Sequence, residues 1–228
     1  MKIKEKKEDL LANIIYDLKT PTNAQITALE SFLKTSGKKI NSEEKDLIEL
    51  TLNSCLHVQK LIDNFSSAYR LNFENLKLNY EKFDIVNMIN TIIKEADILL
   101  KYSQLNVDFN LKDEIIIYAD KAQVQKVIEN ILYNNINHAF KDSTIEIAIS
   151  KEKNYLIFQT KSKSPYIEPQ ILKEIFDKYK THNTNYNKTI VNLGLYLSKE
   201  IICAHFGKMI AKSFDDNTNI LGFSIPIK

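Results

Sequence analysis

The hexapeptide Tyr16-Asp17-Leu18-Lys19-Thr20-Pro21 lies inside an amphipathic run that extends from about residue 9 to residue 36. Apolar side chains recur along this run at steps typical of one helical face, namely Leu11, Ile14, Leu18, Ala28 and Phe32. On a helix Tyr16 lies about 200° from Ile14 and Leu18, and Asp17 and Thr20 follow it within about one turn. The run therefore predicts a long helix with an exposed patch of Tyr16, Asp17 and Thr20 and a kink at Pro21.

A second amphipathic run begins near Ser42, after a break at Thr35-Ser36-Gly37. Its apolar positions again follow steps of three and four, at Leu47, Leu50, Ser54, Val58, Leu61, Phe65 and Ala68. Two long helices joined by a short loop form an antiparallel hairpin. A lone hairpin leaves one apolar stripe uncovered, so we expect residues 1–73 to form a four-helix bundle in a homodimer.

Composition narrows the class of protein. The 228 residues are 44% hydrophobic, enough for one large or two small domains, and the net charge of +2 comes from dispersed residues, which argues against a nucleic-acid partner. Cys55 and Cys203 are isolated, which fits a reducing compartment and neither a disulfide framework nor a zinc site. Without a long apolar run, we expect no membrane segment in this chain and a cytoplasmic location, although a sensor or membrane part could lie outside it.

The pattern changes after residue 73. Strands are expected near residues 76–83, 105–111, 115–119, 144–149, 155–160, 208–214 and 221–227. Helices are expected near residues 85–100, 120–140, 168–177 and 193–205, with a polar, Asn-rich loop over residues 178–192. Residues 74–228 are therefore predicted to form an α+β sandwich, a mixed sheet with helices on one face.

Four segments resemble boxes of the two-component sensor histidine kinases. The hexapeptide is similar to the phosphoacceptor box, with Tyr16 in place of the acceptor His. Residues 120–135 resemble the asparagine box, residues 172–179 the phenylalanine box, and residues 193–199 the end of the second glycine box. Because the four segments occur in the family's order and cover nearly the whole chain, the protein is identified as a divergent member of that family.

The resemblance implies a site for ATP and Mg²⁺ in the second half of the chain. Asn130 and Asn134 are four residues apart on one helix, so both amide oxygens could reach a hydrated Mg²⁺ and the phosphates that it bridges. An alternative is that an Asn-rich composition places these residues by chance. The remaining positions implied for the nucleotide site are Ser162, Gly194 and Leu195.

Departures from the family pattern point to weak or lost nucleotide binding. Ser162 stands where the family has an Asp that accepts the adenine amino hydrogen, and a hydroxyl is an uncharged and shorter acceptor. Four positions where the family has glycine carry side chains, namely Ser164, Tyr166, Ile190 and Asn192. Side chains there should obstruct the approach of the backbone to the purine and the phosphates.

The acceptor position also departs from the family. A phenol has a pKa of about 10 and forms a stable phosphate ester, unlike the labile phosphoramidate of an imidazole. Asp17 and Thr20 remain, and by resemblance Thr20 can position a water that dephosphorylates a bound response regulator. We therefore expect a pseudokinase that docks a response regulator through the hairpin. The alternatives are an active ATP-dependent kinase that uses Tyr16 as acceptor, and a signalling scaffold that binds neither nucleotide nor receiver. His57 is expected to be a packing or surface residue.

Overall fold

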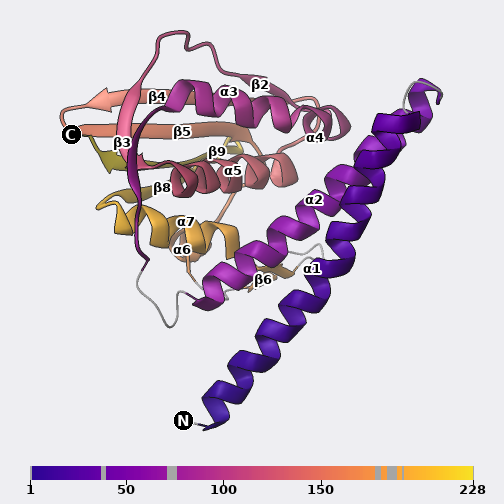
Figure 1. Ribbon diagram of the computed structural model, residues 1–228. Helices are drawn as coiled ribbons and strands as arrows, with labels where there is room; N and C mark the ends of the chain where they lie inside the picture. The colour runs from indigo at the N-terminus through magenta and orange to yellow at the C-terminus, as the bar shows by residue number, and fades with distance from the viewer. Residues whose placement is uncertain are drawn as a thin grey trace. The chain divides into compact units, whose positions relative to one another are not determined.

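The computed structural model describes residues 2–36, 40–70, 76–177, 181–183, 189–191 and 193–227 (Figure 1). The chain divides into two compact units, residues 1–74 and 75–228. The first unit is a hairpin of two helices, α1 (Lys2–Ser36) and α2 (Ser42–Arg70). Asn41 caps α2 in a reciprocal capping box: Glu44 N donates to Asn41 Oδ1 (2.8 Å) and Asn41 N donates to Glu44 Oε2 (3.0 Å).

The apolar stripe expected on α1 is not the side that faces α2. Its members Ile14, Leu18 and Phe32 are 42%, 52% and 41% exposed. The contacts to α2 come from neighbouring positions: Lys19 pairs with Asp63 (2.5 Å), and Gln59 donates to Asn23 (2.7 Å). The periodicity correctly predicted an apolar stripe, but the single hairpin leaves this stripe exposed.

The stripe expected on α2 behaves in the same way. Leu47, Val58 and Leu61 are 63%, 44% and 51% exposed. The hairpin therefore carries exposed apolar side chains on both helices, at spacings built from steps of three and four residues.

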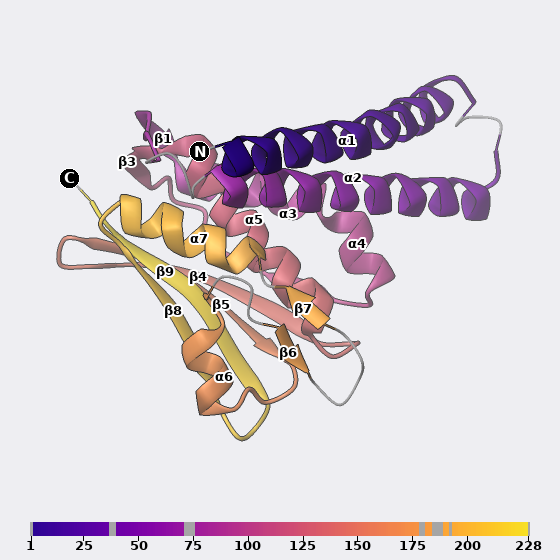
Figure 2. The ribbon, with the colours of Figure 1, turned by 90° about the horizontal axis from the view of Figure 1, so that it is seen from below.

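The second unit is an α+β fold, as expected. Its central sheet has the strand order β2-β4-β5-β9-β8, in which β2 and β4 run parallel and all other neighbours antiparallel, so the sheet is mixed. The strands of this sheet are β2 (Asn106–Asp108), β4 (Thr144–Glu152), β5 (Tyr155–Lys163), β8 (Lys208–Ser213) and β9 (Thr218–Pro226). Helices α3 (Ile85–Glu95), α5 (Lys121–His138) and α7 (Leu193–Ala204) cover one face of it (Figures 1 and 2).

Smaller elements complete this unit. They are an antiparallel pair, β1 (Tyr80–Asp84) with β3 (Ile116–Asp120), the short helices α4 (Asp97–Tyr102) and α6 (Pro169–Glu174), and a second pair, β6 (Thr181–Asn183) with β7 (Thr189–Val191). Two aspartates end strands and begin helices. Asp84 accepts from the backbone N–H groups of Val86 and Asn87 at the start of α3, and Asp120 accepts from that of Gln123 at the start of α5.

The core lies between the sheet and the helices. Alternate residues of β5 and most residues of β9 are buried, and the rings of Phe158 and Phe223 stack with centroids 5.2 Å apart. Gly222 on β9 permits this close approach, since a Cβ there would lie 2.2 Å from the carbonyl oxygen of Phe158. The second unit is therefore held by a continuous apolar layer beneath α5.

Three expectations need correction. The helix expected over residues 85–100 is two helices, because the chain bends at Ala96 (φ −84°, ψ −4°) between α3 and α4. The first two strands are shorter than expected, Tyr80–Asp84 and Asn106–Asp108. The polar loop expected over residues 178–192 contains the β6–β7 pair, to which the β-branched run Thr189-Ile190-Val191 is well suited.

Candidate functional site

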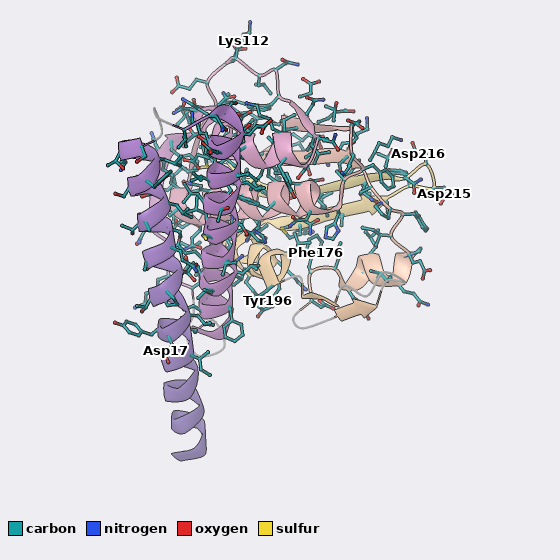
Figure 3. All side chains as sticks on the ribbon, turned by 90° about the vertical axis from the view of Figure 1, so that its right-hand side faces the viewer. Asp17, Lys112, Phe176, Tyr196, Asp215 and Asp216 are labelled. Carbon is teal, nitrogen blue, oxygen red and sulfur yellow. The ribbon has the colours of Figure 1, made fainter. Side chains whose placement is uncertain are left out.

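The patch expected on α1 is exposed. Tyr16 is 71% exposed, and Asp17 and Thr20 are exposed as well. Asp17 lies on α1 in Figure 3. Tyr16, Asp17 and Thr20 therefore lie together on the exposed surface of α1, as the hexapeptide predicted.

Pro21 lies inside α1, under this patch. Proline has no N–H to donate to the carbonyl four residues earlier, which is that of Asp17. The hydroxyls on either side donate to the neighbouring carbonyls instead: Thr20 Oγ1 to Tyr16 O (2.9 Å) and Thr22 Oγ1 to Leu18 O (2.8 Å). The hydroxyl proton of Thr20 is therefore donated to the main chain, while its oxygen can still accept a hydrogen bond from a water.

His57 on α2 is half-buried. Burial, and secondly the charge of Lys60, lowers the pKa of its imidazole below the ordinary value of 6.5. A half-buried ring fits the expected packing role better than that of a phosphoacceptor, which must be accessible.

The two asparagines expected to hold Mg²⁺ have different surroundings. Asn130 is buried, and its Nδ2 donates to Gly194 O (3.0 Å) and Ser198 Oγ (3.4 Å) on α7. Asn134 is half-buried on the same helix. The Asn130 amide therefore fastens α5 to the first turn of α7. No cluster of three or more His, Cys, Asp or Glu side chains suited to a metal occurs in the described residues.

Tyr133 lies between these two asparagines on α5. Burial raises the pKa of its phenol, and the carboxylates of Glu129 and Glu95 raise it further. The side chain is thus held as a neutral phenol on the helix that carries the asparagine box.

Ser162 is the centre of a buried polar network. It is 3% exposed, and its hydroxyl donates to Asn135 Oδ1 (2.7 Å). Asn135 Nδ2 donates to Ile131 O (2.8 Å) and to Thr160 Oγ1 (2.9 Å), and Thr160 Oγ1 donates to Leu221 O (3.1 Å). The Ser162 hydroxyl, expected to accept from a base, thus donates its proton within the chain.

A second polar group fixes the segment that follows Ser162. Asn219 is paired with Ser162 across β9 and β5, and its Nδ2 donates to Ser164 Oγ (2.5 Å) and Pro165 O (2.9 Å). The backbone N–H of Tyr166 donates to Asn217 Oδ1 (3.2 Å). Asn219 Oδ1 is buried and accepts no hydrogen bond within the described residues. Two former glycine positions, Ser164 and Tyr166, are thus tied to the β8–β9 hairpin, whose turn carries Asp215 and Asp216 (Figure 3).

The end of the second glycine box forms the start of α7. Gly194 accepts from Asn130 and from Ser198 Oγ (2.8 Å), and Leu195 is buried in the core. The described glycines have no positive φ, so Gly194 does not use the conformation that distinguishes glycine from other residues. Ile190 pairs with His182 in the β6–β7 strands, and Asn192 lies outside the described residues.

An ion pair joins α7 to the residues that follow α6. Lys199 Nζ on α7 lies 3.1 Å from Asp177 Oδ1, just after α6. Phe176, which precedes Asp177, and Tyr196, three residues before Lys199, are marked in Figure 3. The ion pair brings the residues that precede and follow segment 178–192 together.

These residues do not fit a 6-aminopurine as the resembled family holds it. The acceptor position is an uncharged hydroxyl that is 3% exposed and held against Asn135, and Ile190, at one of the family's glycine positions, is in a strand. Asn219 Oδ1 is the acceptor that still lacks a donor among the described residues. Asn135, Thr160 and Asn219 were not predicted as site residues, although the four-residue step from buried Ile131 places Asn135 on the inner face of α5.

Comparison with known proteins places both halves of the chain beside sensor proteins and ATPase domains. The model of the histidine kinase-, DNA gyrase B- and HSP90-like ATPase family matches residues 119–226, which implies an ATP site in the second unit. The sensor protein VanSC of Enterococcus gallinarum is 26% identical over 97% of this chain and 61% of that protein. The sensor histidine kinase YvrG of Bacillus subtilis is 24% identical over 96% of this chain and 38% of that protein. The chain thus spans less than two thirds of the length of either relative.

Solved structures of similar proteins show the same fold. The histidine kinase AdeS of Acinetobacter baumannii has a TM-score of 0.63 at 18% identity, over 90% of this chain and 96% of that chain. Full-length ShkA, determined in complex with AMPPNP, has a TM-score of 0.67 at 16% identity, over 96% of this chain and 46% of that chain. In the described part of this chain, no helix is long and apolar enough to cross a bilayer.

Proposed function

Because this chain belongs to the two-component sensor histidine kinase family, we propose that it is a dimeric signalling protein that docks a response regulator but has lost kinase chemistry. In this proposal residues 1–73 form the dimerisation and docking domain, and residues 74–228 a degenerate ATP-binding domain. The observation that carries the proposal is the exposed Tyr16 at the acceptor position, beside Asp17 and Thr20 on the same surface.

The chemistry of Tyr16 supports the loss of autokinase activity. Its phenol is exposed to water, and a hydroxyl is a weak nucleophile unless a neighbouring base activates it. A tyrosine phosphate is a stable ester, so a receiver aspartate could not readily remove the group. Tyr16 serves instead as an aromatic contact for a docked receiver, since a tyrosine offers apolar area and one hydroxyl with little rotamer freedom to lose.

Thr20 supports a role in receiver dephosphorylation. Its hydroxyl proton is donated to Tyr16 O, which fixes the oxygen on the exposed side of α1. An oxygen fixed in this way can accept a hydrogen bond from the water that attacks an aspartyl phosphate, and orienting that water lowers the entropic barrier of the reaction. This reaction does not use the residue at position 16 as a nucleophile.

Dimerisation is supported by the exposed apolar residues of the hairpin. Leu18 on α1 and Leu61 on α2 are each about half exposed in the single chain. A second copy with the same stripe covers them through an isologous, two-fold interface, which gives a four-helix bundle.

Exposure of Tyr16 also favours a second candidate, an active kinase that phosphorylates this tyrosine. An accessible hydroxyl is what such a kinase requires, and the family match implies an ATP site. The two candidates differ in whether the second unit binds Mg-ATP.

Calorimetry and labelling with radioactive ATP separate the candidates. We expect no micromolar binding of Mg-ATP, no label on the wild type and no label on Tyr16→His, because that change restores an imidazole without a nucleotide site. Tyr16→Phe is the matched control for the phenol hydroxyl. Micromolar binding with label lost in Tyr16→Phe would establish the tyrosine kinase instead, and label on Tyr16→His would show a working nucleotide site.

A further inference from the structure

Asn135 is a polar residue on the apolar face of α5. It is 4% exposed and follows buried Ile128 and Ile131 by seven and four residues, so it lies on their side of the helix. That side faces the central sheet, where the inward side chains of β5 include Thr160 and Ser162. A carboxamide at such a position requires hydrogen-bond partners in the sheet, because an unsatisfied buried amide destabilises the fold.

The partners of Asn135 complete a closed network. Both amide protons of Asn135 are donated, one to Ile131 O and one to Thr160 Oγ1. The Thr160 proton is donated to Leu221 O, and the Ser162 proton to Asn135 Oδ1. All four polar protons of the three side chains therefore have acceptors inside the chain, across α5, β5 and β9.

We propose that Asn135 substitutes for a ligand at the base end of this site and blocks recognition of a 6-aminopurine. Ser162 stands at the position where the resembled family has the acceptor for the amino group of the base. Its hydroxyl donates its proton to Asn135 and is nearly inaccessible to solvent. The carboxamide supplies from within the chain the polar partner that a bound base would otherwise supply. This inference rests on the proposed loss of nucleotide binding and names the residue that blocks the base end of the site.

The network also explains how the unit stays folded without nucleotide. Buried polar groups that are satisfied by one another stabilise and specify a core, whereas partly satisfied ones destabilise it. A site that needs a base to satisfy Ser162 would be less stable when empty. Here the empty site and the folded unit are compatible because Asn135 closes the network.

Four variants test the proposal: Asn135→Ala, Ser162→Asp, the double variant that combines them, and Asn137→Ala as a control. Asn137 is exposed on the same helix, two residues from Asn135. Thermal unfolding should show that Asn135→Ala lowers the Tm by roughly 2–10 °C, as expected for the loss of one buried hydrogen-bonding partner, while Asn137→Ala changes it by about 1 °C at most.

Mg-ATP binding should strengthen markedly only in the double variant. A charged acceptor strengthens a hydrogen bond by a factor of about ten to a hundred in affinity, but Ser162→Asp alone sets the new carboxylate against Asn135 Oδ1. Calorimetry should therefore show binding at least about tenfold tighter for the double variant than for Ser162→Asp, with Mg-GTP bound no better than before because it lacks the 6-amino group.

The outcomes separate this inference from the proposed function. If the wild type lacks binding and Ser162→Asp binds as tightly as the double variant, Asn135 is not the block, and only this inference is wrong. Micromolar binding by the wild type would refute the loss of nucleotide binding itself, and Asn219 Oδ1 would then be the acceptor to test. If the double variant fails to fold, Ser162→Ala and its combination with Asn135→Ala replace it, and additive Tm shifts in that cycle would overturn the proposal.

Discussion

Replacing Leu61 with Asp should separate the dimer without unfolding the hairpin. Leu61 is 51% exposed in the single chain, so a charge at this position remains in contact with water when the protomer is alone. In the proposed dimer the same position is covered by the second copy. The substitution therefore acts mainly on association.

The size of the effect follows from that exposure. Complete burial of a leucine contributes about 1.5–3 kcal/mol, so covering the exposed half contributes about 0.8–1.5 kcal/mol in each copy. The two-fold interface loses this contribution twice, about 1.5–3 kcal/mol, and an unpaired carboxylate at the interface costs several kcal/mol more. The dimer dissociation constant should increase by at least about a thousandfold, since every 1.4 kcal/mol is a factor of ten.

Light scattering over a range of micromolar concentrations measures this change, with thermal unfolding as the test of folding. Thr27→Asp is the matched control, because Thr27 is exposed on α1 outside the apolar stripe and receives the same charge. A Leu61→Asp protein that stays dimeric at low micromolar concentration would refute the interface, and so would a wild type that is monomeric there.

Three further predictions concern the hairpin patch, pH and the sheet. Thr20→Ala should leave receiver binding nearly unchanged but abolish any accelerated loss of phosphate from the receiver, as measured by the release of inorganic phosphate. An unchanged rate of dephosphorylation would exclude the water-positioning role. Because the pKa of His57 is lowered in the folded protein, the unfolded chain binds more protons below about pH 6.5, so stability should fall as the pH drops through that window. Denaturant titrations at several pH values should show a flatter profile for His57→Gln, and an identical profile would contradict this assignment. Gly222→Ala should destabilise the second unit by about 3 kcal/mol or more, since the new Cβ would lie 2.2 Å from Phe158 O; a change under about 1 kcal/mol would mean that β5 and β9 can move apart.

The fold could be predicted largely because local signals agree with one another. The helix expected over residues 120–140 is α5, Lys121–His138, and Asp120 provides the cap that starts it. The strands with alternating apolar residues, such as β5, were located to within a few residues. The division at Ala96 was missed because Ile92 and Leu100 are both buried and preserve an apolar face across the bend.

The candidate site was harder to predict because hydrogen-bond partners are distant in sequence. Asn130, Asn134, Asn135 and Asn137 are close together on one helix, and composition alone does not distinguish them. Their surroundings do, since Asn135 meets Ser162 on β5 whereas Asn137 is exposed. The partner of Ser162 follows from how α5 packs on the sheet, which the resemblance to a family with aspartate at this position does not reveal.

The hairpin shows a similar limit. Helical periodicity predicts that Leu18 and Leu61 lie on apolar stripes, but it does not say which neighbour covers each stripe. Contacts such as Lys19–Asp63 define the side on which α1 and α2 meet. Only this arrangement shows that the predicted stripes remain open for a second chain.

The hydrogen bond from Ser162 to Asn135 has a consequence for how this protein can change over generations. Aspartate at position 162 alone would bring a carboxylate against an amide oxygen with no proton between them, and alanine at position 135 alone would leave the buried Ser162 hydroxyl without its acceptor. Each single step toward a base-binding site thus passes through a less stable protein, although the two steps together need not. Because the effects of the two substitutions are coupled, a protein that carries Asn135 and Ser162 cannot easily regain a base-binding site by one substitution at a time.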